Sequence, residues 1–382
     1  MKVLISGAGI GGCTLAWWLG NSGHEVTVVE RSQTQRSSGA PVDVEGPAVE
    51  IVEAMGVMGR LRDAATRVSG MRFVDARGRE AVRVDTSSIA SARRSRDVEL
   101  PRGDLARVLE DAARERASFV FGDHLTSLAQ DDDGVSVGFA SGKSDRFELV
   151  VGADGLHSGV RKLLFGDEAQ FINHQGLYVA TLPLPAGDEG HDIVMFNAPG
   201  RSLTLHPSRS RAMAAFIFWS PQVTFDVRDE SQQRSFIERT FANDGWRVPE
   251  ILKAIRETDE LYFDSVSRVS LPKWSRGRVA LLGDAASCVS LFGGGSSLAI
   301  RGAWQLARSL QDRSLSDALT HYEREHRKTT DPRTRGMSSV ASLLIPKSAA
   351  TIWARNAALH LWPIFRALGR LRPSGPSLAP AR

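Results

Sequence analysis

Three short apolar runs in the chain each lead directly into a turn that contains glycine or aspartate. They cover residues 3–5, 149–151 and 279–282. Continuous apolar runs of this length are typical of strands buried on both faces. Helix-like segments at residues 11–20 and 297–310 follow two of the turns. The pattern predicts an α/β fold in which the strand-to-helix turns carry the chemistry.

The first turn has the spacing Gly7-x-Gly9-x-x-Gly12, and Gly11 opens the helix that follows. In a strand–turn–helix unit, the first glycine permits the tight turn and the second lets the backbone approach a pyrophosphate. The third lets the helix pack on the strand, while the helix N-terminus faces the anion. The turn is therefore interpreted as a dinucleotide-binding turn of a Rossmann-like domain.

A second strand, residues 25–29, ends at Glu30, eighteen positions after Gly12. A carboxylate at this place accepts hydrogen bonds from both hydroxyls of an adenosine ribose. An acidic residue there favours FAD or NAD over NADP. Arg31, the next residue, is included among the expected cofactor contacts.

The third apolar run, with its Gly-Asp turn, distinguishes between the two dinucleotides. Asp284 and a second helix N-terminus lie far along the chain from the first turn, and a ligand that reaches both is longer than the pyrophosphate of NAD requires. FAD fits, with Asp284 on the ribityl hydroxyls. The flavin pyrimidine edge is expected to face backbone N–H groups of Gly293, Gly294, Gly295, Ser296 and Ser297. Taken alone, Asp154 after the middle run reads as a helix cap or a ligand contact.

Together the three motifs resemble the class A flavin monooxygenases of the para-hydroxybenzoate hydroxylase fold. The likeness extends to actinobacterial-type aromatic and polyketide hydroxylases and to tetracycline-degrading enzymes. It implies that Asp154 serves FAD and NADPH, that Arg102 reaches the FAD and that Asp43 lies near the isoalloxazine. It also implies FAD as cofactor, NAD(P)H as a transient co-substrate, and oxygenation through a flavin C4a-hydroperoxide, with no protein nucleophile. The catalytic residues therefore stay unassigned.

The chain departs from the family after the Gly-Asp motif, where Ser287 and Leu291 replace a common histidine and proline. Other FAD-dependent oxidoreductases, such as reductases, dehydrogenases or halogenases, stay open as an alternative, and so does a flavin-binding protein without activity. A Trp-x-Trp-x-Ile-Pro motif of the halogenase type is absent from the sequence.

The motifs and the strand-like alternation between them predict two interleaved domains. The expected FAD-binding domain comprises residues 1–69, 100–173 and 267–332. A mixed or antiparallel substrate-binding sheet is expected from residues 70–99 and 174–266, followed by a C-terminal bridging helical segment at 333–372 and a disordered tail at 373–382.

The predicted sheet supplies the candidate substrate contacts. Alternating residues at 203–206 and 214–219 indicate strands, and one face is expected to cover an aromatic substrate. Candidates for that face are Met195, His206, Met213, Phe216 and Phe218, with Phe196 and Trp219 beside them. His206 and Arg201 are candidates to bind or deprotonate a phenol. The same residues could instead be ordinary sheet core.

Composition limits which classes of protein remain possible. The 48 basic and 44 acidic residues leave a net charge of +4, too balanced to indicate nucleic-acid binding. Cys13 and Cys288 form no metal or disulfide pattern, so no metal is expected. A signal-peptide cleavage site would destroy the glycine turn, and no apolar run is long enough to span a bilayer, so a cytoplasmic monomer or homodimer is expected.

Overall fold

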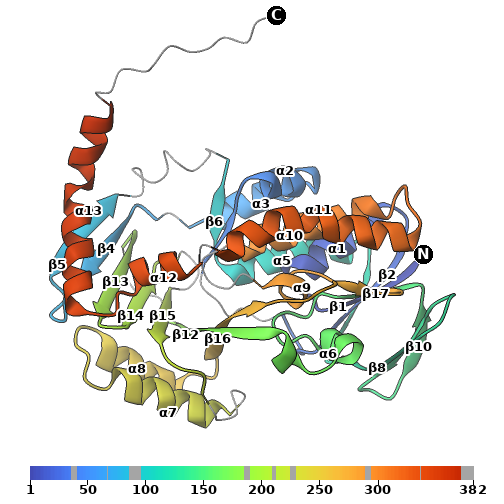
Figure 1. The fold of residues 1–382 in the computed structure, drawn as a ribbon, viewed down its shortest axis with the longest axis horizontal. Helices are drawn as coiled ribbons and strands as arrows, with labels where there is room; N and C mark the ends of the chain where they lie inside the picture. Colours follow the sequence, from blue (N-terminus) through green and yellow to red (C-terminus); the bar gives the residue numbers. More distant parts are fainter. Residues whose placement is uncertain are drawn as a thin grey trace, which may run out of the picture.

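The computed structural model describes residues 1–35, 41–66, 68–85, 96–184, 190–208, 212–223, 229–288, 294–335 and 337–370. In this part of the chain, a six-stranded and a seven-stranded sheet lie side by side, with helices around both (Figure 1). Two small antiparallel sheets complete the strands, β3(Val42–Val44) with β6(Val98–Leu100), and β8(Leu125–Gln130), β9(Val135–Phe139) and β10(Ser144–Phe147).

The six-stranded sheet has the order β17-β18-β11-β1-β2-β7. Its pairs are parallel except that of β17 with β18. The strands are β1(Lys2–Ser6), β2(Glu25–Glu30), β7(Ser118–Phe121), β11(Leu149–Gly152), β17(Ser275–Arg276) and β18(Val279–Leu281). The apolar runs therefore form the centre of a parallel sheet, which confirms the predicted α/β fold.

Strand β1 has β2 on one side and β11 on the other, so the chain order reverses at β1. In open α/β sheets, ligands bind at this kind of switch point, outside the carboxyl ends of the strands. The helices around this sheet include α1(Ile10–Asn21), α2(Pro47–Ala54), α3(Met58–Asp63), α5(Arg102–Arg114), α6(Gly159–Phe165), α9(Asp284–Ser287), α10(Gly295–Ser309) and α11(Leu315–Arg335). Helix α1 packs between α5 and α10, and its buried side chains join the same hydrophobic core.

The seven-stranded sheet has the order β16-β12-β15-β14-β13-β4-β5. Its strands are β4(Gly70–Val74), β5(Glu80–Asp85), β12(Ile172–Pro183), β13(Asp192–Ala198), β14(Arg201–His206), β15(Met213–Trp219) and β16(Tyr262–Val269). All its pairs are antiparallel except that of β13 with β4. Segments far apart in the sequence thus form one mixed sheet, as predicted.

The two faces of this sheet have different covers (Figure 1). Helices α7(Glu230–Phe241) and α8(Val248–Glu257) close one face with a continuous apolar cluster. On the opposite face, α12(Met337–Leu344) covers the end of β12 and β15, and α13(Ala349–Arg370) covers β4, β5 and β13. No helix in the described ranges is long and apolar enough to cross a bilayer. The tail predicted at 373–382 lies outside the described residues.

Candidate cofactor and substrate site

The glycine-rich turn between β1 and α1 leaves a gap in front of the helix N-terminus. Gly7 has φ +107°, and a Cβ there would lie 2.5 Å from the carbonyl oxygen of Ala153. A Cβ on Gly12 would lie 1.9 Å from the carbonyl oxygen of Gly7. At Gly9, the N-cap of α1, a Cβ would meet no atom within 4 Å. The turn is therefore closed on the sheet side and open at Gly9, which fits a phosphate on the helix N-terminus.

Glu30 ends β2 beside this turn. Its carboxylate accepts hydrogen bonds from the backbone N–H of Ala8 at 3.0 Å and of Ser32 at 2.9 Å. These bonds fix the carboxylate at the carboxyl edge of the sheet, next to the turn. Arg31 is exposed, and its guanidinium lies near Gly159 at the start of α6. Ribose binding by Glu30 stays a prediction.

The turn after β11 is held by its own polar side chains. The hydroxyl of Ser158 accepts from the N–H of Arg161 at 2.9 Å, so Ser158 is the N-cap of α6. Asp154 accepts from the hydroxyl of Ser158 and from the N–H of Val160, and burial raises the pKa of Asp154. Arg161 is fully buried and donates to the carbonyl of Ala285 at 3.0 Å, which ties this turn to the Gly-Asp motif.

The Gly-Asp turn brings residues from three distant segments together. Gly283 has φ +63°, and the half-buried Asp284 begins α9. Burial raises the pKa of Asp284, while Arg102 at the start of α5 opposes that shift. Tyr262, the first residue of β16, is within electrostatic reach of both Arg102 and Asp284. The edge of the seven-stranded sheet therefore meets the predicted ribityl-binding pair.

The start of α10 is fastened to β3. The hydroxyls of Ser296 and Ser297 donate to the carbonyl oxygen of Asp43 at 2.7 and 2.9 Å. Gly294 caps the helix in the left-handed conformation, with φ +65°. The structure thus brings together Asp43 and the helix start that the sequence placed at the flavin, whereas Gly293 lies outside the described residues.

These features fit FAD as one extended ligand. The open turn at Gly9 suits the pyrophosphate, and the carboxylate of Glu30 suits the adenosine ribose. Arg102 and Asp284 offer a donor and an acceptor for the ribityl chain, and the α10 N-terminus offers N–H groups for the flavin. Their contacts with FAD stay predictions.

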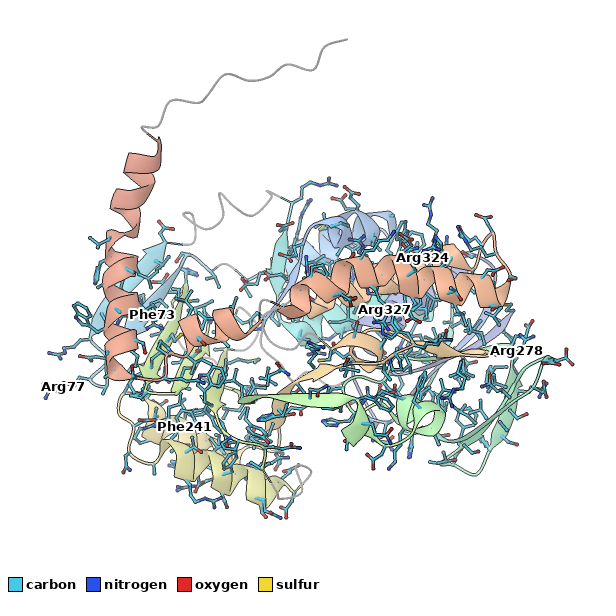
Figure 2. All side chains as sticks on the ribbon, in the orientation of Figure 1. Phe73, Arg77, Phe241, Arg278, Arg324 and Arg327 are labelled. Carbon is cyan, nitrogen blue, oxygen red and sulfur yellow. The ribbon has the colours of Figure 1, made fainter. Side chains whose placement is uncertain are left out.

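Phe216 and Phe218 do not lie on the side of the sheet that meets this site. Both belong to the cluster under α7 and α8, and the ring of Phe216 lies 4.6 Å, centroid to centroid, from that of Phe241. Figure 2 shows Phe241 between α7 and the sheet. This corrects the expectation that the two aromatic residues contact substrate. Alternation identified residues that share a face but could not show which face the helices cover. Phe196 joins the same cluster.

The opposite face carries Met195, Met213 and His206, as the pairing of β13, β14 and β15 requires. Burial lowers the pKa of His206 to about 4, so its imidazole is neutral at neutral pH and is a poor base. Arg201 is ion-paired with Asp244, with Nη2 2.8 Å from Oδ1. The suggestion that His206 or Arg201 deprotonates a phenol therefore has no support in the structure.

A charged bridge that no sequence pattern predicts joins the two large sheets. His157, in the turn before α6, lies 3.2 Å from a carboxylate oxygen of Glu168 and 3.2 Å from one of Asp264 on β16. The two carboxylates raise the pKa of His157 to about 9. The imidazole is therefore protonated at neutral pH and links the Asp-Gly turn to the substrate sheet.

We expect this bridge to make stability depend on pH. Because the folded-state pKa exceeds the ordinary 6.5, the stabilisation is fully present below pH 6.5 and is lost as pH rises through about 9. The His157 side chain is 37% exposed, so solvent screening limits the effect to about 1 kcal/mol. His157→Gln should lower the free energy of unfolding at pH 6.5 and not at pH 10. The exposed His191→Gln is the control, and an equal loss at both pH values contradicts the assignment.

Known proteins are similar to this chain in sequence and in fold. Residues 1–333 match the FAD binding domain family. A flavin-dependent monooxygenase of an unknown prokaryotic organism is 33% identical over 81% of this chain and 81% of its own, and one of Legionella longbeachae is 31% identical over 84% of each. An uncharacterised protein of Mycobacterium tuberculosis is 38% identical over 81% of this chain and 84% of its own.

Solved structures agree in fold. The tetracycline destructase Tet(51) superposes with a TM-score of 0.83 at 29% identity, covering 98% of this chain and 99% of that one. Klebsiella pneumoniae HpxO, complexed with FAD and uric acid, has a TM-score of 0.70 at 24% identity and covers 96% and 95%, a likeness of fold alone. The chain therefore belongs to the FAD-binding-domain family of class A flavin monooxygenases, and its cofactor is FAD.

Proposed function

We propose that this monooxygenase uses NAD(P)H and O2 to hydroxylate an aromatic or polycyclic small molecule of polyketide or antibiotic type. The proposal rests on one observation. The edge of the seven-stranded sheet lies beside the residues that are predicted to hold the cofactor. Helix α9, which begins with Asp284, packs against the edge strand β16, and Tyr262 at the start of that strand lies within electrostatic reach of Arg102 and Asp284. The face that carries Tyr262 is the one without α7 and α8, so a flat substrate on this face would lie next to a flavin held by these residues.

The residues of the chain hold and orient the reactants. The Gly9 turn, Glu30, Arg102 and Asp284 would hold the FAD, which when bound and reduced supplies the oxygen-transferring chemistry. The buried side chains on the face opposite α7 and α8, between α12 and α13, would exclude water and present a neutral imidazole, that of His206, to substrate. The sequence contains a single glycine-rich dinucleotide turn, which supports a nicotinamide that visits transiently.

The similarity to a protein called a tetracycline destructase, at 29% identity over nearly the whole chain, favours a polycyclic substrate. Among the structures that share the fold alone, one holds uric acid and another 2-aminobenzoylacetate, so the scaffold accommodates small ring-bearing molecules of several kinds. These likenesses support the chemical class without identifying a compound.

Mass spectrometry of product formed under 18O2 tests the function. The holoenzyme is incubated with NADH or NADPH and hydroxylated polycyclic aromatics, and NAD(P)H oxidation is followed with and without each compound. We expect substrate-stimulated oxidation and the incorporation of one 18O atom into product. Reduction of the flavin and conversion of substrate without 18O incorporation would instead establish a reductase or dehydrogenase.

A further inference from the structure

We propose that Thr181, Thr204 and His206 form a polar row that recognises hydroxyl or keto oxygens on a neutral polycyclic substrate. The inference rests on the proposed function and adds the recognition residues and the charge class of the ligand. Of the three, the sequence pattern indicates only His206, because alternation does not show the side-chain partners of a threonine in a strand.

The register of the sheet places the two hydroxyls on one face. Thr181 on β12 and Thr204 on β14 both pair with Ala215 on the strand between them. Cross-strand partners point to the same face, and neighbouring strands lie about 4.8 Å apart, so the two threonines flank Ala215 at about 10 Å from each other. His206 follows two residues after Thr204 and pairs with Met213, so its ring lies on this face as well.

Three polar atoms of this row lack hydrogen-bond partners within the described ranges. Thr181 is 2% exposed and Thr204 is 1% exposed, yet neither hydroxyl, nor Nδ1 of His206, makes a hydrogen bond with any residue that the structure describes. Buried polar groups are nearly always paired, and an unpaired one is unfavourable. Elsewhere in the same sheet, the hydroxyls of Ser265 and Ser267 lie 2.7 Å apart and satisfy one another. A ligand that offers oxygen atoms would satisfy the row.

The surroundings of the row suit flat rings. Val179, Met213 and Ala215 are buried on the same face, but they lie outside the hydrophobic clusters that the described residues form around the two sheets. On this face, α12 and α13 each cover a separate apolar cluster, one on either side of these three residues. The apolar side chains that belong to none of these clusters therefore lie beside the unpaired polar atoms.

The row also lies near the cofactor residues. Tyr262 pairs with Thr181 and is within electrostatic reach of Arg102 and Asp284. At the other strand of the row, His206 is within electrostatic reach of Glu99 on β6, whose cross-strand partner is Asp43. A molecule on the row would thus lie between two groups of residues that the FAD assignment uses.

The charge of the row defines the ligand class. In the described parts of β12, β13, β14 and β15, the positions on this face between the two helical covers hold Val, Thr, Ala, Met, His, Ser and Pro, with no Lys or Arg. Asp264 on β16, the cross-strand partner of Val179, adds a carboxylate to the same face. The buried Arg355 of α13, at the border of this face, already donates to the amide oxygen of Asn197 and to the carbonyl of Leu344. A buried carboxylate requires a cationic or multiply donating partner. We therefore infer that phenols, enols and ketones bind here and that aromatic carboxylates do not.

Equilibrium binding to the holoenzyme tests the row apart from turnover. The probes are 1,8-dihydroxyanthraquinone and anthraquinone-2-carboxylate, titrated by perturbation of the flavin absorbance. We expect the dihydroxy compound to bind at least tenfold more tightly. Thr181→Val and Thr204→Val should each weaken its binding about fivefold or more and leave FAD content unchanged. Ser267→Ala, on the face toward α7, is the matched control and should leave binding unchanged.

Thermal unfolding of the ligand-free holoenzyme provides the second readout. Because the threonine hydroxyls have no partner, the valine variants should keep or raise Tm, whereas Ser267→Ala should lower it. Tighter binding of the carboxylate, absence of binding of the dihydroxy probe, or a lowered Tm in both valine variants overturns the inference. Incorporation of 18O into another substrate would leave the proposed function intact in each of these cases.

Discussion

Replacing Gly12 with alanine should destabilise the FAD-binding sheet by about 3 kcal/mol or more and prevent FAD retention. The added Cβ would lie 1.9 Å from the carbonyl oxygen of Gly7, a backbone atom that cannot move without displacing the turn. Forced overpacking typically costs 1–3 kcal/mol, and a backbone clash this close lies at the upper end. Chemical unfolding of the apoprotein measures the loss directly.

Gly9→Ala is the matched control because its Cβ would meet nothing within 4 Å and its φ is −76°. We expect its apoprotein stability to stay within about 0.5 kcal/mol of wild type. Its FAD affinity should nevertheless fall tenfold or more, since the methyl group occupies space that the pyrophosphate needs. Equal FAD affinity in Gly9→Ala and wild type would contradict the placement of the pyrophosphate at this turn.

The sequence predicted the parts of the fold that are determined by residues close together along the chain. The glycine spacing, the apolar strand and the acidic strand end lie within the first 30 residues, so one strand–turn–helix unit determines them. The convergence of Asp284 with Arg102 was expected from the family resemblance. The structure places Arg102 within electrostatic reach of Asp284, and it adds a contact that no spacing rule predicts, from Arg161 to the carbonyl of Ala285, 124 positions away.

The missed features depend on packing between segments distant in the sequence. Alternation correctly paired Phe216 with Phe218, but the apolar faces of α7 and α8 decided which side of the sheet they occupy. The bridge from His157 to Asp264 joins residues 107 positions apart, for which no spacing rule exists. Similarly, Ser158 is the N-cap of α6, and Asp154 accepts a hydrogen bond from the Ser158 hydroxyl. The sequence does not show which of these two polar residues is the cap.

Asp284→Ala should weaken FAD binding ten- to a hundredfold and leave the fold intact. The carboxylate begins α9 beside Arg102, and burial raises its pKa, which means that the apoprotein gains little from keeping it charged. Arg102 and the thiol of Cys288 lie near it within the chain, and we expect its strongest partners to be the ribityl hydroxyls of FAD. Loss of a charge-assisted hydrogen bond costs about 1.5–3 kcal/mol, which corresponds to that range of affinity. Titration of apoprotein with FAD, followed by flavin fluorescence, measures the change.

Asp192→Asn gives the opposite pattern and serves as control for the loss of a buried carboxylate. Asp192 is 8% exposed and is ion-paired with Arg72 at 3.2 Å and Arg83 at 3.1 Å at the start of β13. Its removal leaves arginines unpaired, so the free energy of unfolding should fall while FAD affinity stays at the wild-type value. If Asp284→Ala instead lowers stability like Asp192→Asn and binds FAD as tightly as wild type, Asp284 supports the fold and the ribityl chain lies elsewhere.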